Sequence, residues 1–139
     1  MSVKCFLLEP VGDPDGKLWK RAGTGEVKEL RDFGPGAMWF ATWMDQEAKG
    51  PEGQTRYGWN WDNQFTPPLI VRLPGGCDWD VDSRASNCTM KEDRLHRCWI
   101  RHGEPPNVTV DKRGLTCGAG AGSILTDNYH GFLQNGVLT

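Results

Sequence analysis

Apolar residues in this chain come in short runs or alternate with polar residues, a pattern typical of β-strands rather than long helices. The densest run is AMWFATW at 37–43, which follows a Gly-Pro-Gly turn and is rich in aromatic residues. It predicts a buried strand. LIVRLPGG at 69–76 and the strictly alternating DWDVD at 78–82 predict a hairpin that turns at Pro74 to Cys77.

Weaker patterns predict further short elements. HRCWIRH at 96–102 and NVTVD at 107–111 are strand candidates. The Asn135-Gly136 pair between two apolar dipeptides is typical of a hairpin turn. Near the start, residues 6–8 and 27–30 predict either edge strands or single helical turns.

The fold class that follows is all-β or β-rich α+β, with short antiparallel strands and hairpins in one compact domain. We expect one domain over 1–139, with a turn-rich segment at 1–36 and a β-rich core at 37–139. The core contains a long polar loop at 44–68. Eighteen glycines and nine prolines support many turns and short elements.

Charge and hydropathy narrow the function classes. The net charge is -2 and the isoelectric point is near 5.9, without a basic run, so nucleic-acid binding is not expected. Apolar runs are far shorter than the roughly 20 residues that span a bilayer, so no membrane partner is expected. The first apolar run is also shorter than the about seven residues of a signal-peptide core, which predicts a cytosolic location.

Cysteine and histidine cluster in NCTMKEDRLHRCWIRHG at 87–103. If residues 96–102 are extended, His96, Cys98 and His102 share one face; if they are helical, Cys98 and His102 meet. Either geometry offers two metal ligands, since in a strand His102 would lie about 20 Å from His96, too far to bind the same ion. The candidate ligands for a zinc ion, the one cofactor that we consider, are Cys88, His96, Cys98, His102 and Cys117. Because the chain lacks a C-x-x-C pair, we favour buried structural cysteines and no cofactor.

An enzyme is the second class considered. A thiol-dependent enzyme would use Cys88 or Cys117 with His130, and a metal-dependent hydrolase would use the Cys/His cluster with Asp82 or Asp80 as the base. The glycine-rich GAGAGS after Cys117 would supply backbone N–H groups for an anion, but it matches neither a Walker loop nor a dinucleotide fingerprint.

A binding surface is the third class. Aromatic residues in the long loop, at Tyr57, Trp59 and Trp61, predict a contact surface or core filling under the loop. Three arginines from the polar segment would extend this surface: Arg84, Arg97 and Arg101. The aspartates of DWDVD lack a calcium-loop pattern, so we interpret them as solvent-facing.

Several stretches of the chain together carry a family resemblance: PGAMWFATW, LPGG with DWDVDSRASNC, HRCWIRHGEPPNVTVD, GLTCGAGAGSI and YHGFLQNGVLT. With these, the chain resembles a family of small proteins of unknown function from tailed bacteriophages and prophages. More distantly it is similar to a broader domain of unknown function, through Gly36 to Trp43, Ser123-Ile124 and His130-Gly131. The resemblance implies a phage or prophage origin and no particular activity.

These observations favour a non-catalytic phage accessory protein that binds a host or virion protein. A metal- or thiol-dependent enzyme and a virion decoration protein are the alternatives. The expected location is the host cytoplasm or the virion. The oligomeric state stays open.

Overall fold

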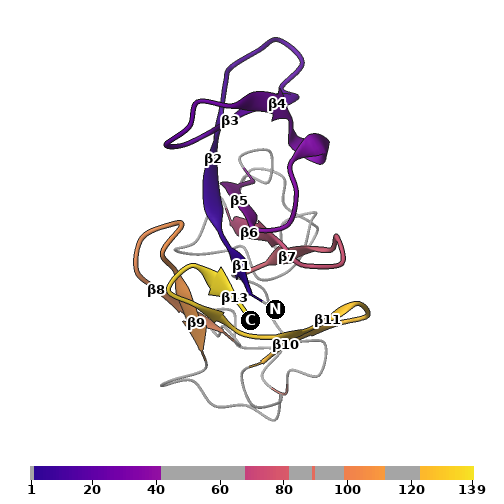
Figure 1. The fold of residues 1–139 in the computed structure, drawn as a ribbon, viewed down its shortest axis with the longest axis vertical. Coiled ribbons are helices and arrows are strands. Elements are labelled where there is room, and N and C mark those ends of the chain that lie inside the picture. The colour runs from indigo at the N-terminus through magenta and orange to yellow at the C-terminus, as the bar shows by residue number, and fades with distance from the viewer. Residues whose placement is uncertain (1, 42–67, 82–88, 90–98, 112–122) are drawn as a thin grey trace.

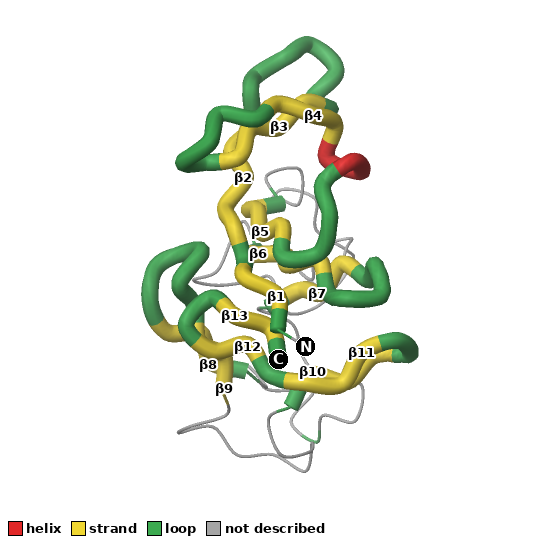
Figure 2. The backbone as a smooth tube through the Cα atoms, viewed as in Figure 1, coloured by secondary structure: helices red, strands yellow, loops and turns green. Residues whose placement is uncertain are grey.

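A computed structural model describes residues 2–41, 68–81, 89, 99–111 and 123–139 of the chain. Short strands dominate these ranges, and their one turn of 3-10 helix is η1 (Leu30–Asp32), red in Figure 2. The predicted β-rich class is therefore confirmed. In the described ranges no helix is long and apolar enough to cross a membrane.

The largest sheet has six strands (Figure 1). In spatial order they are β4 (Val27–Glu29), β3 (Leu18–Arg21), β2 (Phe6–Pro10), β5 (Ala37–Phe40), β6 (Leu69–Arg72) and β7 (Asp78–Asp80). Neighbours are antiparallel except β2 and β5, which are parallel. Residues 6–8 form a strand, which was one of the two alternatives predicted, but β2 is an interior strand and not an edge strand. Residues 27–29 do form an edge strand, and η1 follows directly.

Strands β5 and β6, which lie side by side in this sheet, are buried on both faces. Met38 lies opposite Val71, and Trp39 lies opposite Ile70, and all four side chains are buried. Because successive strand residues point to opposite sides, the Met38 and Trp39 pairs belong to different faces. The unbroken apolar run at 37–40 follows from this double burial, since a strand with one solvent face would alternate.

Each face of the sheet has its own hydrophobic core. The first core consists of Cys5, Met38, Leu69, Val71, Leu73, Val81, Trp99, Val108, Val110, Ile124, Leu133 and Leu138. The second core consists of Leu8, Trp19, Phe33, Ala37, Trp39, Ala41 and Ile70. The first core joins the sheet to the C-terminal elements, and the second joins β5 and β6 to the β2–β4 end.

The Arg72 side chain links the segment around η1 to the second core through hydrogen bonds and ring stacking. Its guanidinium donates to both carboxylate oxygens of Asp78, at 2.8 and 3.1 Å, and to the carbonyls of Leu30 and Phe33, at 2.8 and 2.6 Å. The same group lies 5.1 Å from the ring centre of Trp39. One side chain thus ties the β6–β7 hairpin to a segment about forty positions earlier in the chain.

Three smaller groups of strands cover the first core (Figure 1). They are the sheet of β1 (Val3–Lys4), β13 (Val137–Leu138) and β12 (Leu133–Gln134), and the pairs β8 (Ile100–His102) with β9 (Thr109–Asp111) and β10 (Ile124–Thr126) with β11 (Tyr129–Gly131). Since β1 pairs with β13, the two ends of the chain lie side by side.

Both predicted hairpins are confirmed. Strands β6 and β7 are antiparallel, and the turn closes where the Leu73 N–H donates to the Cys77 carbonyl at 2.8 Å. Asn135 and Gly136, with φ of 48° and 74°, form the turn between β12 and β13. Positive φ at both positions matches the twist of paired strands, which is why Asn-Gly is favoured there. The strand predicted at 107–111 is present as β9.

Candidate binding surface

Strands β10 and β11 form a two-stranded hairpin, residues 123–132, which we call the arm (Figure 1). Its turn packs against the β6–β7 turn, because a Cβ on Gly75 would lie 2.8 Å from Cβ of Asn128. Leu125 lies directly opposite His130 in the pair, so their side chains share one face. Burial alternates along the chain: His130 and Phe132 are exposed, whereas Gly131 and Leu133 are buried. Leu125, His130 and Phe132 therefore form one outward face, which we call the arm face.

The arm face is apolar at both ends. Leu125 is 72% exposed and Phe132 is 47% exposed. Single exposed apolar residues are common on protein surfaces, but two large ones on the same side of one hairpin suit a contact surface. His130 lies between them, with Nε2 3.1 Å from Oγ of Ser123.

The inner side of the arm is fixed to the body. Ile124 is buried in the first core, and the Tyr129 hydroxyl donates to the Thr139 carbonyl at 2.6 Å. Burial, together with the nearby Cys5, raises the pKa of the Tyr129 hydroxyl, so it stays a donor. Gly131 leaves the room that this contact needs, because a Cβ there would overlap both the Thr139 carbonyl and the Tyr129 hydroxyl. The arm face is thus presented on an ordered support.

The predicted cysteine and histidine cluster falls largely outside the described residues, where Cys88, His96, Cys98 and Cys117 lie. Of the five candidate ligands in this cluster, His102 lies within the described residues. Its Nε2 lies 3.1 Å from Oδ1 of Asp111. An ionised carboxylate only accepts hydrogen bonds, so His102 carries its proton on Nε2 when it makes this contact. Within the described ranges, no three His, Cys, Asp or Glu side chains gather as a metal site would require.

Two cysteines lie within the described ranges. Cys5 is buried in the first core, and burial raises the pKa of its thiol to about 11. It therefore stays protonated at neutral pH and behaves as a small apolar residue. Cys77 is exposed in the turn between β6 and β7.

Some of the DWDVD aspartates and candidate catalytic residues lie within the described residues, and others do not. Asp82, like Cys88 and Cys117, lies outside the described residues. Asp78 is exposed, as predicted, but forms the two-oxygen pair with Arg72 described above. Asp80 is half-buried on β7. His130, the proposed catalytic histidine, has Ser123 as its described hydrogen-bond partner.

Most of the predicted aromatic and arginine surface also lies outside the described residues: Tyr57, Trp59, Trp61, Arg84 and Arg97. Arg101 is described and half-buried, with its guanidinium 5.6 Å from the ring centre of Phe40. That stacking directs Arg101 toward the protein body.

Sequence reasoning missed the arm face. No strand was predicted at residues 123–126, so Leu125 was not singled out as an exposed residue. Strand alternation was the available signal, because it places Ile124 and Leu125 on opposite sides.

Comparison of the chain with models of protein families, with curated proteins and with solved structures finds no match.

Proposed function

We propose that the chain is a non-catalytic accessory protein of a phage or prophage, which binds a host or virion protein through the arm face. The observation that carries this proposal is the pair of exposed apolar side chains, Leu125 and Phe132, on one side of the arm. The family resemblance of the sequence supports the phage origin. The protein would act in the host cytoplasm or on the virion.

The arm face suits protein recognition for a physical reason. Removing large apolar side chains from water is the main favourable term in protein association. A few such side chains commonly carry most of the binding free energy. Tyr129 and Ile124 already hold the arm in place, so binding through it loses little further conformational entropy.

Capture of the partner tests this proposal. Immobilised chain is exposed to extract of infected host cells and, separately, to purified virions, and retained proteins are quantified by mass spectrometry. Replacing Leu125 and Phe132 together with serine should lower capture of the specific partner at least about tenfold, because two apolar anchors are lost.

Val11 and Val27 provide the matched control, since they are 47% and 48% exposed. Val11 directly follows β2 and Val27 lies on β4, an edge strand at the opposite end of the molecule from the arm (Figure 1). The double variant Val11→Ser, Val27→Ser should capture the partner as the unchanged chain does. Circular dichroism and a thermal unfolding curve verify that both double variants fold. Undiminished capture by a folded Leu125→Ser, Phe132→Ser variant would refute the role of the arm face.

A further inference from the structure

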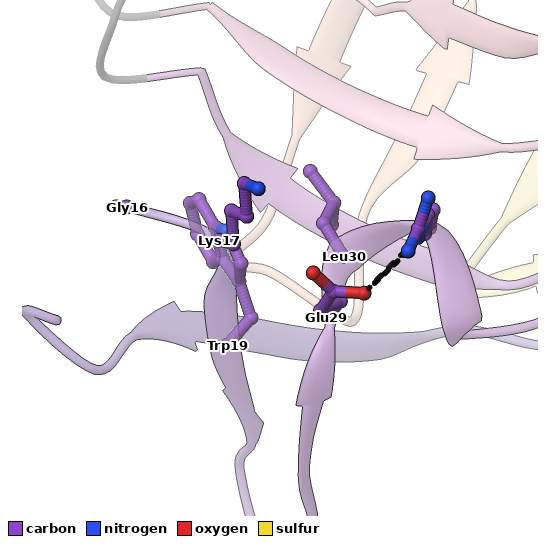
Figure 3. A pocket seen from close by; sticks show the side chains of 6 residues that line it. Gly16, Lys17, Trp19, Glu29 and Leu30 are labelled. Atoms are coloured by element: carbon purple, nitrogen blue, oxygen red, sulfur yellow. Dashed lines mark hydrogen bonds and ion pairs between the residues drawn. The ribbon is translucent and has the colours of Figure 1, made fainter. Parts of the chain in front are cut away.

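A small hollow lies at the β3–β4 end of the molecule, far along its long axis from the arm (Figures 1 and 3). Its volume is about 290 Å³. The residues that line it are Gly16, Lys17, Trp19, Glu29, Leu30 and Arg31. A hollow of this size fits one large side chain or a very small molecule, since pockets for drug-sized ligands span about 300–1,000 Å³.

The register of β3 against β4 brings three of the lining residues onto one face. The Leu30 N–H donates to the Lys17 carbonyl at 3.1 Å, which places these residues opposite each other. Trp19 is two positions beyond Lys17 on the same strand run, so all three side chains share one face. Figure 3 shows Lys17 and Leu30 flanking the open space, with Trp19 beside them.

The backbone around the hollow is held from both sides. Asp13 accepts hydrogen bonds from the N–H groups of Lys17 and Leu18, at 3.1 and 3.2 Å. Arg72 donates to the Leu30 carbonyl at 2.8 Å. The hollow is therefore preformed, and an occupant need not order it.

The chemistry of the lining is apolar below and positively charged at the rim. Trp19 and Leu30 supply the apolar part, and Trp19 is almost completely buried in the second core. Arg31 pairs with Glu29 at 2.9 Å, which neutralises both charges. The Lys17 ammonium makes no ion pair within the described part of the chain, so one positive charge stands at the rim.

We infer that this hollow binds an apolar side chain of a partner polypeptide that has an acidic residue next to it. The apolar side chain would contact Trp19 and Leu30, and the neighbouring carboxylate would pair with Lys17. The inference shares with the proposed function only the premise of a protein partner, and it uses a surface at the other end of the molecule.

Titration of isotope-labelled full-length chain with short blocked peptides, followed by NMR, tests the inference. The probe is acetyl-Asp-Phe-Asp-amide, with acetyl-Lys-Phe-Lys-amide and acetyl-Asp-Ser-Asp-amide as comparisons. We expect saturable shifts of the Trp19 indole and the Leu30 amide with the first peptide, and at least about fivefold weaker responses with the other two.

Charge reversal at position 17 provides the more discriminating test. Lys17→Glu should weaken binding of the Asp-Phe-Asp peptide and strengthen binding of the Lys-Phe-Lys peptide. Lys20→Glu is the matched control, because Lys20 is exposed on the opposite face of β3, and it should leave both affinities unchanged. The chain with Leu125→Ser and Phe132→Ser should bind the peptide normally, so failure here is distinguishable from failure of the arm face.

Three results would overturn the inference. They are absence of shifts at Trp19 and Leu30 at millimolar peptide, equal shifts with all three peptides, and equal effects of Lys17→Glu and Lys20→Glu. Isovaleric acid, an apolar carboxylic acid, is titrated in parallel. If it binds as tightly as the Asp-Phe-Asp peptide, the hollow accepts a small carboxylic acid, which also contradicts a polypeptide occupant.

Discussion

Replacing Arg72 with alanine should lower the free energy of unfolding by about 2–4 kcal/mol. The change removes the pair with Asp78 and the donor to the Phe33 carbonyl, and it leaves the Leu30 carbonyl with only the longer bond from the Phe33 N–H, at 3.3 Å. Only 12% of the Arg72 side chain is exposed, so water replaces these contacts poorly. Chemical denaturation monitored by tryptophan fluorescence measures the loss.

Arg31→Ala is the matched control for Arg72→Ala. Arg31 also pairs with a carboxylate, that of Glu29, at 2.9 Å, but its side chain is 81% exposed. An exposed pair contributes at most about 1 kcal/mol. If both substitutions cost the same, Arg72 does not hold the η1 segment on the second core as described above.

Replacing Trp39 with alanine should cost about 3–5 kcal/mol of unfolding free energy, the range for truncating a large buried aromatic residue. Trp39 is 2% exposed and belongs to the second core, with Arg72 stacked over its ring. Truncation would leave a cavity between strands β5 and β6 and the η1 segment. Urea denaturation at constant pH quantifies the effect.

Trp39→Phe separates packing from hydrogen bonding at the same position. The buried indole nitrogen of Trp39 has no hydrogen-bond acceptor among the described residues, so a phenyl ring gives up no polar contact. We expect a loss below about 1.5 kcal/mol, as for other swaps that keep most of the volume. A loss as large as that of Trp39→Ala would show that the indole is required for more than its volume.

The sequence predicted those parts of the fold whose cause is local. The turn at Asn135-Gly136 is favoured by two residues that tolerate positive φ, and the run at 37–40 reflects burial on both faces. Both signals can be recognised in a window of a few residues. The hairpin of β6 and β7 was predictable for the same reason.

Strand order was less accessible, because it depends on contacts between distant segments. Residues 6–8 have the composition of an edge strand, yet β2 pairs with β3 on one side and with β5 on the other. Arg72 shows the same limit. No local pattern distinguishes it from an ordinary solvent-exposed arginine, and its acceptors Leu30 and Phe33 come from a distant segment.

The sequence predicted that the protein has an exposed binding surface, but not where in the fold the exposed apolar residues lie. An exposed apolar surface was expected from the loop aromatics Trp59 and Trp61, which lie outside the described residues. The pair of exposed apolar residues that the structure places on one hairpin is Leu125 and Phe132, on the arm. Two apolar neighbours such as Ile124 and Leu125 look alike in a sequence, and only strand pairing determines which one faces solvent.

Photo-crosslinking from position 125 tests directly whether the arm face contacts a partner protein. A photoreactive benzophenone amino acid replaces Leu125 in one sample and Val27, at the far edge strand, in the other, and both are irradiated in infected-cell extract and with virions. We predict one dominant crosslinked polypeptide from position 125 and none from position 27. Absence of a specific product at position 125, or the same products from both positions, would contradict it.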